Sequence, residues 1–123
     1  MRLRLLIAIA LGAAPATAVA MPVATFLTKA DALQRKGPMA LFSSDLKLLT
    51  NQIKRDAGEL RAENKAAEAA GRRKAYCAPA GGVKLTNRDI LGAMNAVPPP
   101  QRATTQTKDA LRAYFARRFP CPR

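Results

Sequence analysis

Acidic side chains on one short segment are the first candidates for chemistry. Asp56 and Glu59 are three residues apart and Glu59 and Glu63 are four apart, so a helix would place all three on one face. Two carboxyl groups can act as general acid and general base only where a cleft separates their pKa values, and the surrounding sequence indicates no such cleft. We therefore expect these side chains to lie in solvent and to pair with basic neighbours such as Arg55 and Lys65.

The chain of 123 residues contains no His and only two Cys, which excludes several kinds of site. Without His there is no Ser-His-Asp or Cys-His catalysis and no His-ligated zinc. Two Cys are too few for an iron–sulfur cluster or a four-Cys zinc site. Gly81-Gly82 indicates a turn, because a phosphate-binding loop would need a strand before it and Gly-Lys-Ser/Thr after it. We predict that the protein is not an enzyme and uses no metal or cofactor.

Residues 1–20 have the three parts of a secretory signal peptide. Arg2 and Arg4 give a positive start, residues 5–11 are apolar, and residues 18–20 form an Ala-x-Ala cleavage site. The apolar stretch is only about half as long as the roughly 20 residues of a membrane span. We predict that the segment is removed, that the protein is exported to the bacterial periplasm or the medium, and that the mature chain has no membrane span.

Two cleavage positions fit the signal. The mature chain is predicted to begin at Met21, or at Val19 if the earlier Ala16-Thr17-Ala18 site is used. Removal of residues 1–20 takes away Arg2 and Arg4 and leaves 19 basic against 8 acidic residues, a net charge of +11.

Cys77 and Cys121 both lie in the predicted mature chain, and an even number of Cys in an oxidising compartment indicates a disulfide. The bridge would close a ring of about 45 residues, which the chain-entropy model values at roughly 4 kcal/mol. The alternative is a reactive thiol or a redox pair, but the chain has neither Cys-x-x-Cys spacing nor a His to activate a thiolate. We predict a Cys77–Cys121 disulfide.

Apolar residues recur at helical spacing in four segments, and none alternates as a strand would. The first segment begins near Val23 and ends at Gly37-Pro38. The second carries an apolar stripe from Phe42 to Leu60, widened by Leu41 and Leu48, and begins either at Pro38 or near residue 44, after a Ser-Ser-Asp cap. Its Ala-rich continuation, residues 61–70, has little to bury and is predicted to project or to pack loosely.

Residues 71–85 are predicted to be a loop. A third helix follows a cap formed by Thr86 and Asp89, and Pro98-Pro99-Pro100 is predicted to be a stiff extended link. The last helix begins among residues 104–107 and stops at Pro120. These signals predict an all-α fold, a small bundle of about four helices with one disulfide. Residues 21–70 form its N-terminal region of two helices, and residues 71–123 form a disulfide-closed helical hairpin.

Positive charge is concentrated in residues 71–123, which hold 11 basic and 2 acidic side chains against 8 and 6 in residues 21–70. Such a surface either is simply solvated or meets an acidic protein or an anionic cell-surface polymer. Nucleic acid is not an expected partner, because the chain has no recognised binding signature and is predicted to be exported. The basic residues from which a contact surface could be drawn are Arg72, Arg73, Lys74, Lys84 and Arg88.

Two short Cys motifs resemble a known family. Tyr76-Cys77-Ala78-Pro79 and a terminal Arg118-Phe119-Pro120-Cys121-Pro122, separated by a Gly turn, a short helix, a Pro-containing break and a last helix, are similar to the C-terminal part of the Tai/Rap-type immunity proteins of type VI secretion. The resemblance covers residues 75–122. It implies a small periplasmic α-helical protein, often a homodimer, whose two Cys motifs are disulfide partners and which blocks a peptidoglycan-cleaving amidase effector. Residues 21–70 lack the further Cys and the Gly-Tyr-Ile-like segment of that family.

Two functions of different class follow from these observations. The first is an exported helical binding protein whose stapled basic half occludes another exported protein. The second is a cationic envelope-associated structural module held by charge to anionic polymers. A neighbouring gene for a cell-wall amidase would favour the first function, and salt-sensitive retention on isolated envelopes would favour the second. We favour protein binding.

Overall fold

A computed structural model describes residues 20–123, so most of the predicted signal peptide lies outside the described residues. The order of elements is α1 (Val23–Lys36), the 3-10 helix η1 (Gly37–Phe42), α2 (Ser44–Ala69), α3 (Asn87–Asn95), the 3-10 helix η2 (Pro99–Gln101) and α4 (Thr107–Arg118). The described part contains four α-helices and no strand beyond one isolated bridge between Pro22 and Gln106, which confirms the all-α prediction. None of its helices is long and apolar enough to cross a membrane.

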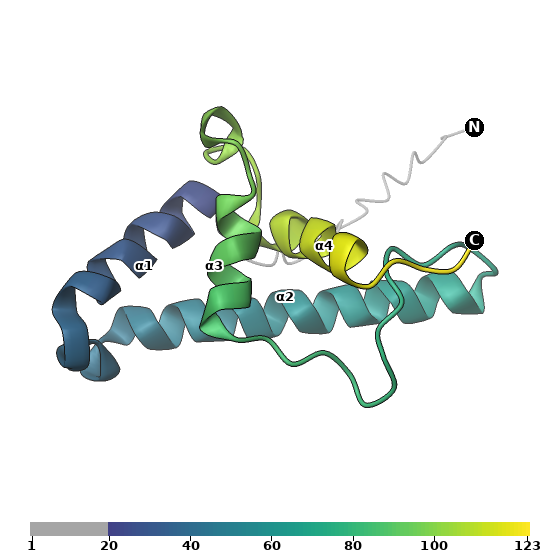
Figure 1. Ribbon diagram of the computed structural model, residues 1–123, viewed down its shortest axis with the longest axis horizontal. Coiled ribbons are helices and arrows are strands. Elements are labelled where there is room, and N and C mark those ends of the chain that lie inside the picture. The colour runs from purple at the N-terminus through teal and green to yellow at the C-terminus, as the bar shows by residue number, and fades with distance from the viewer. Residues whose placement is uncertain (1–19) are drawn as a thin grey trace, which may run out of the picture.

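The long helix α2 organises the bundle. α1 contacts its N-terminal half and α4 its C-terminal half, and α3 lies between α1 and α4 (Figure 1). The chain turns sharply between α1 and α2, and η1 forms this corner at one end of the molecule (Figure 1).

Two hydrophobic clusters form the core, and both take side chains from each side of residue 70. The first joins Val23 and Phe26 of α1 and Ile53 of α2 to Met94 of α3. The second joins α2 to the loop before α3, to α3 and to α4, through Leu60, Tyr76, Ala93, Leu111 and Phe115. The two regions predicted from the sequence therefore share one core.

The helix ends follow the local signals in the sequence. Thr86 and Asp89 form a reciprocal capping box at the start of α3, in which each side chain accepts a hydrogen bond from the other residue's backbone N–H. Gly37 and Gly71 follow α1 and α2 with φ of 57° and 67°, a left-handed conformation that Gly adopts readily. The Ser43 side chain caps α2 by accepting a hydrogen bond from the Asp45 N–H, so the later of the two predicted starts is confirmed.

The expected burial of the first residues of the second apolar stripe is wrong. Because α2 begins at Ser44, Leu41 and Phe42 belong to η1, are out of phase with the helix, and are 75% and 84% exposed. Leu48, expected to widen the stripe, is 45% exposed.

The link at residues 98–100 is also not extended as predicted. Residues 99–101 form the 3-10 helix η2, because the φ fixed by the Pro rings also suits a 3-10 turn, and the Gln101 N–H closes it on the Pro98 carbonyl. In the Ala-rich end of α2, all residues of 61–70 except Asn64 and Ala67 are exposed, so most of the segment projects as predicted, but Glu63 and Asn64 form hydrogen bonds with α4 and with the loop before α3.

Candidate functional site

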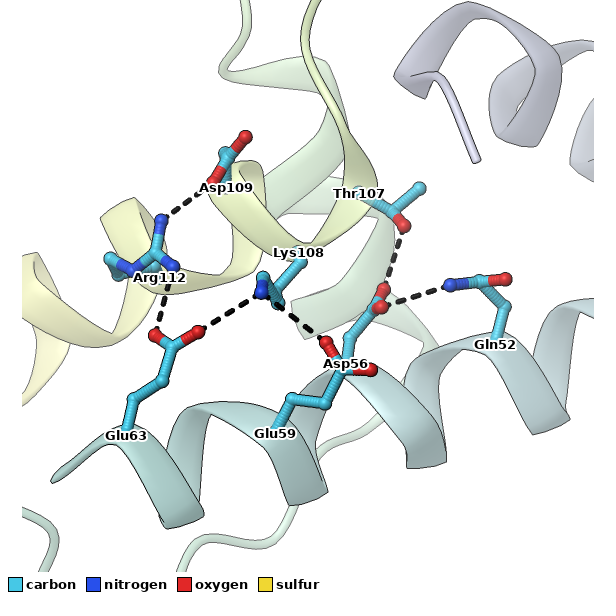
Figure 2. A network of polar contacts seen from close by, with 8 residues as sticks. All are labelled: Gln52, Asp56, Glu59, Glu63, Thr107, Lys108, Asp109 and Arg112. Carbon is cyan, nitrogen blue, oxygen red and sulfur yellow. Dashed lines mark hydrogen bonds and ion pairs between the residues drawn. The ribbon is translucent and has the colours of Figure 1, made fainter. Parts of the chain in front are cut away.

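The carboxylates singled out in the sequence lie on the side of α2 that faces α4, although Glu63 is still exposed to solvent. Figure 2 shows Asp56, Glu59 and Glu63 along one side of α2, with Thr107 and Lys108 of α4 opposite them. The helical spacing of the acidic residues sets their common face, and the packing of α4 on α2 brings the donors to it.

Asp56 is a buried carboxylate held by two neutral donors. Its side chain is only 3% exposed. The Thr107 hydroxyl donates a hydrogen bond to Oδ2 over 2.6 Å, and the Gln52 amide donates one to Oδ1 over 2.9 Å (Figure 2). Burial raises the pKa of the Asp56 carboxyl, because removal from water disfavours its charged form, and the two hydrogen bonds oppose this shift. The expectation of a solvent-exposed side chain is therefore wrong for Asp56.

The other two carboxylates form ion pairs across the helix interface. Lys108 Nζ lies 3.3 Å from Glu59 Oε2 and 3.0 Å from Glu63 Oε1, and Arg112 bridges Glu63 at 2.9 Å and Asp109 at 2.6 Å (Figure 2). Hydrogen bonds from Arg112, and to a smaller extent from Lys108, lower the pKa of the Glu63 carboxyl.

The ion-pair partners expected on α2 itself are not the ones observed. Within residues 20–123, Arg55 and Lys65 take part in no ion pair. The cations of α4 take their place, because packing against α2 already holds Lys108 and Arg112 opposite the acidic face. A pattern along one helix could not indicate partners that lie 45 and 49 residues away.

Replacement of Glu63 tests this interface. We expect Glu63→Gln to lower the free energy of unfolding by about 1 kcal/mol or less, because exposed ion pairs contribute little. The pKa of Glu63 is lowered in the folded protein, so its contribution is present above the ordinary Glu pKa and is lost as pH falls through the folded value. Urea unfolding near pH 7 and near pH 2 should show the difference from wild type shrinking in acid.

Glu68→Gln is the control, because Glu68 is more exposed and lies 3.9 Å from its single partner, Lys74. A difference between Glu63→Gln and wild type that stayed the same in acid would contradict a role for the Glu63 charge.

The acidic cluster does not have the arrangement of a metal site. In the described part of the chain, no three Asp, Glu, Cys or His side chains are placed to hold an ion. Beside the cluster, a cavity of about 310 Å³ lies between α2, the start of α4 and residues 20–21. The absence of enzyme activity and of a cofactor stays a prediction.

The two cysteines are paired. Cys77 and Cys121 form a disulfide with Cα atoms 4.9 Å apart. The Cys77 N–H also donates a hydrogen bond to the Phe119 carbonyl over 2.8 Å, so the loop before α3 is held against the end of α4 by a covalent and a backbone contact.

The predicted basic surface is largely open to solvent. Arg72, Arg73, Lys84 and Arg88 are exposed along the loop before α3 and the first turn of α3. Lys74 is half-buried and lies 3.9 Å from Glu68. The structure therefore leaves four of the five candidate cations free to meet an anionic surface.

A cluster of exposed apolar side chains at the α1–α2 corner was missed by the sequence reasoning. We name this cluster the apolar corner; its members are Met39, Leu41, Phe42 and Leu48, with exposed fractions from 45% to 84%. The signals that could have revealed it were the Gly37-Pro38 stop and the Ser43 cap, which together exclude the intervening residues from both helices.

Comparison of the chain with protein-family models, with curated proteins and with solved structures finds no significant match.

Proposed function

We propose that the mature chain is an exported helical binding protein that blocks another exported protein through its apolar corner. The observation that carries the proposal is the exposure of Met39, Leu41 and Phe42 on consecutive turns of η1, while the large apolar side chains of both core clusters are buried. Large apolar side chains gathered on a surface are typical of a contact site for another protein.

The corner is held in a defined shape, which favours tight binding. Gly37 and Pro38 begin η1, its last turn closes with a hydrogen bond from the Ser43 N–H to the Ala40 carbonyl, and Ser43 also caps α2. Because this surface is already ordered in the free protein, little binding free energy would be spent on ordering it when a partner binds. Complete burial of each large apolar side chain contributes roughly 1.5–3 kcal/mol, so the exposed side chains of the corner would supply a substantial part of the binding free energy.

The class of partner is proposed from the Cys motifs. The disulfide joins the two motifs that resemble the Tai/Rap-type immunity proteins, and the fold is all-α as that resemblance implies. We infer that the partner is a peptidoglycan amidase effector of type VI secretion, and that exposed cations of residues 71–123 increase the association rate with an acidic partner.

Capture by three baits tests the proposal. Immobilised wild-type mature protein, Phe42→Ser and the double variant Arg72→Ser/Arg73→Ser are exposed to periplasmic extract, and the retained proteins are identified by mass spectrometry. We expect a cell-wall amidase on the wild-type bait, a loss of affinity of at least about tenfold with Phe42→Ser, and a smaller loss with the Arg variant. Phe42→Ser should fold normally, because its side chain is 84% exposed.

Inhibition is the second readout. The wild-type chain should block release of peptides from peptidoglycan by the captured amidase, and Phe42→Ser should block it more weakly. Equal capture and equal inhibition by wild type and Phe42→Ser would contradict binding through the corner.

The exposed cations favour a second function, a cationic envelope module that binds anionic cell-surface polymers. Four of them, Arg72, Arg73, Lys84 and Arg88, lie in the region of residues 71–123, where basic residues outnumber acidic ones by 11 to 2. This function requires retention on isolated envelopes that falls as salt rises and with Arg72→Ser/Arg73→Ser, but not with Phe42→Ser.

A further inference from the structure

Met21, the predicted first residue of the mature chain, lines the cavity beside the acidic cluster. Its walls include Ala20 and Met21, the carboxylates Asp56 and Glu59 of α2, and Gln106, which precedes α4. The volume of about 310 Å³ leaves room for a small polar group among these side chains.

Backbone contacts hold Met21 at this cavity. The Thr107 N–H donates a hydrogen bond to the Met21 carbonyl over 2.9 Å, and the Val23 N–H donates one to the Thr105 carbonyl over 2.8 Å. Pro22 forms an isolated antiparallel bridge with Gln106 between these two bonds. The position of Met21 is therefore set by contacts that lie entirely within the predicted mature chain.

Two acceptors in the cavity lack a cationic partner. Gln106 Oε1 is buried and accepts no hydrogen bond from any described residue. Asp56 accepts hydrogen bonds only from the neutral Thr107 and Gln52 side chains, and no Lys or Arg in residues 20–123 lies within ion-pair distance of it. Burial of a carboxylate without a counter-ion is costly.

The charged neighbours of Asp56 are held elsewhere or exposed. Lys108 pairs with Glu59 and Glu63, and Arg112 pairs with Glu63 and Asp109. Arg55 also lines the cavity, but its side chain is exposed and forms no ion pair in the described part of the chain. The cluster therefore contains four carboxylates, Asp56, Glu59, Glu63 and Asp109, against two committed cations, so its charge favours a further cation beside Asp56.

We propose that this cavity binds the chain's own α-ammonium group, which is created when the Ala20–Met21 peptide bond is cleaved. A signal peptidase adds water across that bond, leaving a carboxylate on Ala20 and an amine on Met21, which takes up a proton at neutral pH. The ammonium forms an ion pair with Asp56 and donates a hydrogen bond to Gln106 Oε1. Processing thereby completes the polar network between α2 and α4.

The uncleaved chain cannot form this contact. In it the Met21 nitrogen belongs to a peptide group, which carries no charge, and burial keeps the pKa of Asp56 raised. An adjacent cation favours the charged form of a carboxylate, so cleavage is expected to reverse this shift. The proposal rests on cleavage after Ala20 and not on partner binding, so it and the proposed function can fail separately.

The test compares the mature chain, purified with a free Met21 amine, with the same chain acetylated at Met21. NMR titration of the Asp56 carboxyl carbon should give a pKa lower by at least about one unit in the free-amine form, a tenfold change in its proton affinity. The Met21 α-amine should titrate above the ordinary range of about 7.7–8.0. Equal Asp56 pKa values in the two forms would overturn the proposal, as would a mature N-terminus at Val19.

Variants distinguish the proposed ion pair between the Met21 ammonium and Asp56 from the effect that any charged N-terminus would have on stability. Acetylation should destabilise the wild-type chain and the control variant Asp31→Asn, whose carboxylate is exposed on α1 and does not line the cavity, but should have little effect in Asp56→Asn. Arg55→Gln should leave the Asp56 pKa of the free-amine form unchanged; a rise would identify Arg55 as the counter-ion and reject the proposal. If Asp56→Asn fails to fold, the titration of the wild-type chain decides.

Discussion

Phe115→Ala is expected to lower the free energy of unfolding by about 3–5 kcal/mol, the usual cost of removing a buried aromatic ring. Phe115 of α4 is only 2% exposed, and its ring centroid lies 4.9 Å from that of Tyr76 and 6.3 Å from that of Phe119. Its side chain thus connects the loop before α3 to α4, and its removal would leave a cavity in the second cluster. Domains of this size have roughly 5–15 kcal/mol of stability in all, so the variant would be marginal.

Thermal and urea unfolding followed by far-UV circular dichroism measure this loss. The midpoint should fall by at least about 12 °C, since each kcal/mol corresponds to about 4–8 °C in a small domain. Phe42→Ala is the matched control, because it removes the same ring from a position that is 84% exposed and should change stability by no more than about 0.5 kcal/mol. Equal losses in the two variants would mean that the corner is buried and that the second cluster is not the core.

Most of the fold could be predicted from local signals because caps and stops act on neighbouring residues. Thr86 and Asp89 begin α3 through hydrogen bonds across three residues, Gly37 directly follows α1, and Gly71 is the second residue after the end of α2. Such interactions depend on little beyond the chain within one helical turn, so sequence spacing alone indicates them.

The candidate sites were harder to predict because they depend on which elements pack together. The pattern on α2 indicated that Asp56 and Glu63 share a face, but not that Thr107 and Arg112 would lie opposite. The apolar stripe extended correctly from Leu49 to Leu60 and failed at Phe42, because α2 begins at Ser44, the later of the two predicted starts, and Phe42 lies outside the helix. Hydrophobic periodicity indicates which residues could be buried, and the neighbouring element determines whether they are.

Loss of the Cys77–Cys121 disulfide is expected to lower the free energy of unfolding by about 2–5 kcal/mol, with roughly 4 kcal/mol from the entropy of closing its ring. Contacts other than the S–S bond also hold the residues around the bridge in place. Asn64 of α2 accepts a hydrogen bond from the Ala75 N–H over 3.1 Å and donates one to the Tyr76 carbonyl over 2.8 Å, which anchors the segment before Cys77. The reduced protein should therefore keep its helical circular dichroism while unfolding at lower denaturant concentration.

The single and double Cys variants distinguish this mechanism from a loss of local packing. If the bridge acts mainly by restricting the unfolded chain, Cys77→Ala, Cys121→Ala and the double variant should lose the same stability, because each opens the same ring. Additive losses would instead assign the effect to separate contacts of the two side chains. Thiol counting on unreduced mature protein is the direct check, and two free thiols per chain would reject the bridge. A dimer that dissociates only on reduction would show that the bridge joins two copies, and then the ring-closure contribution would be absent.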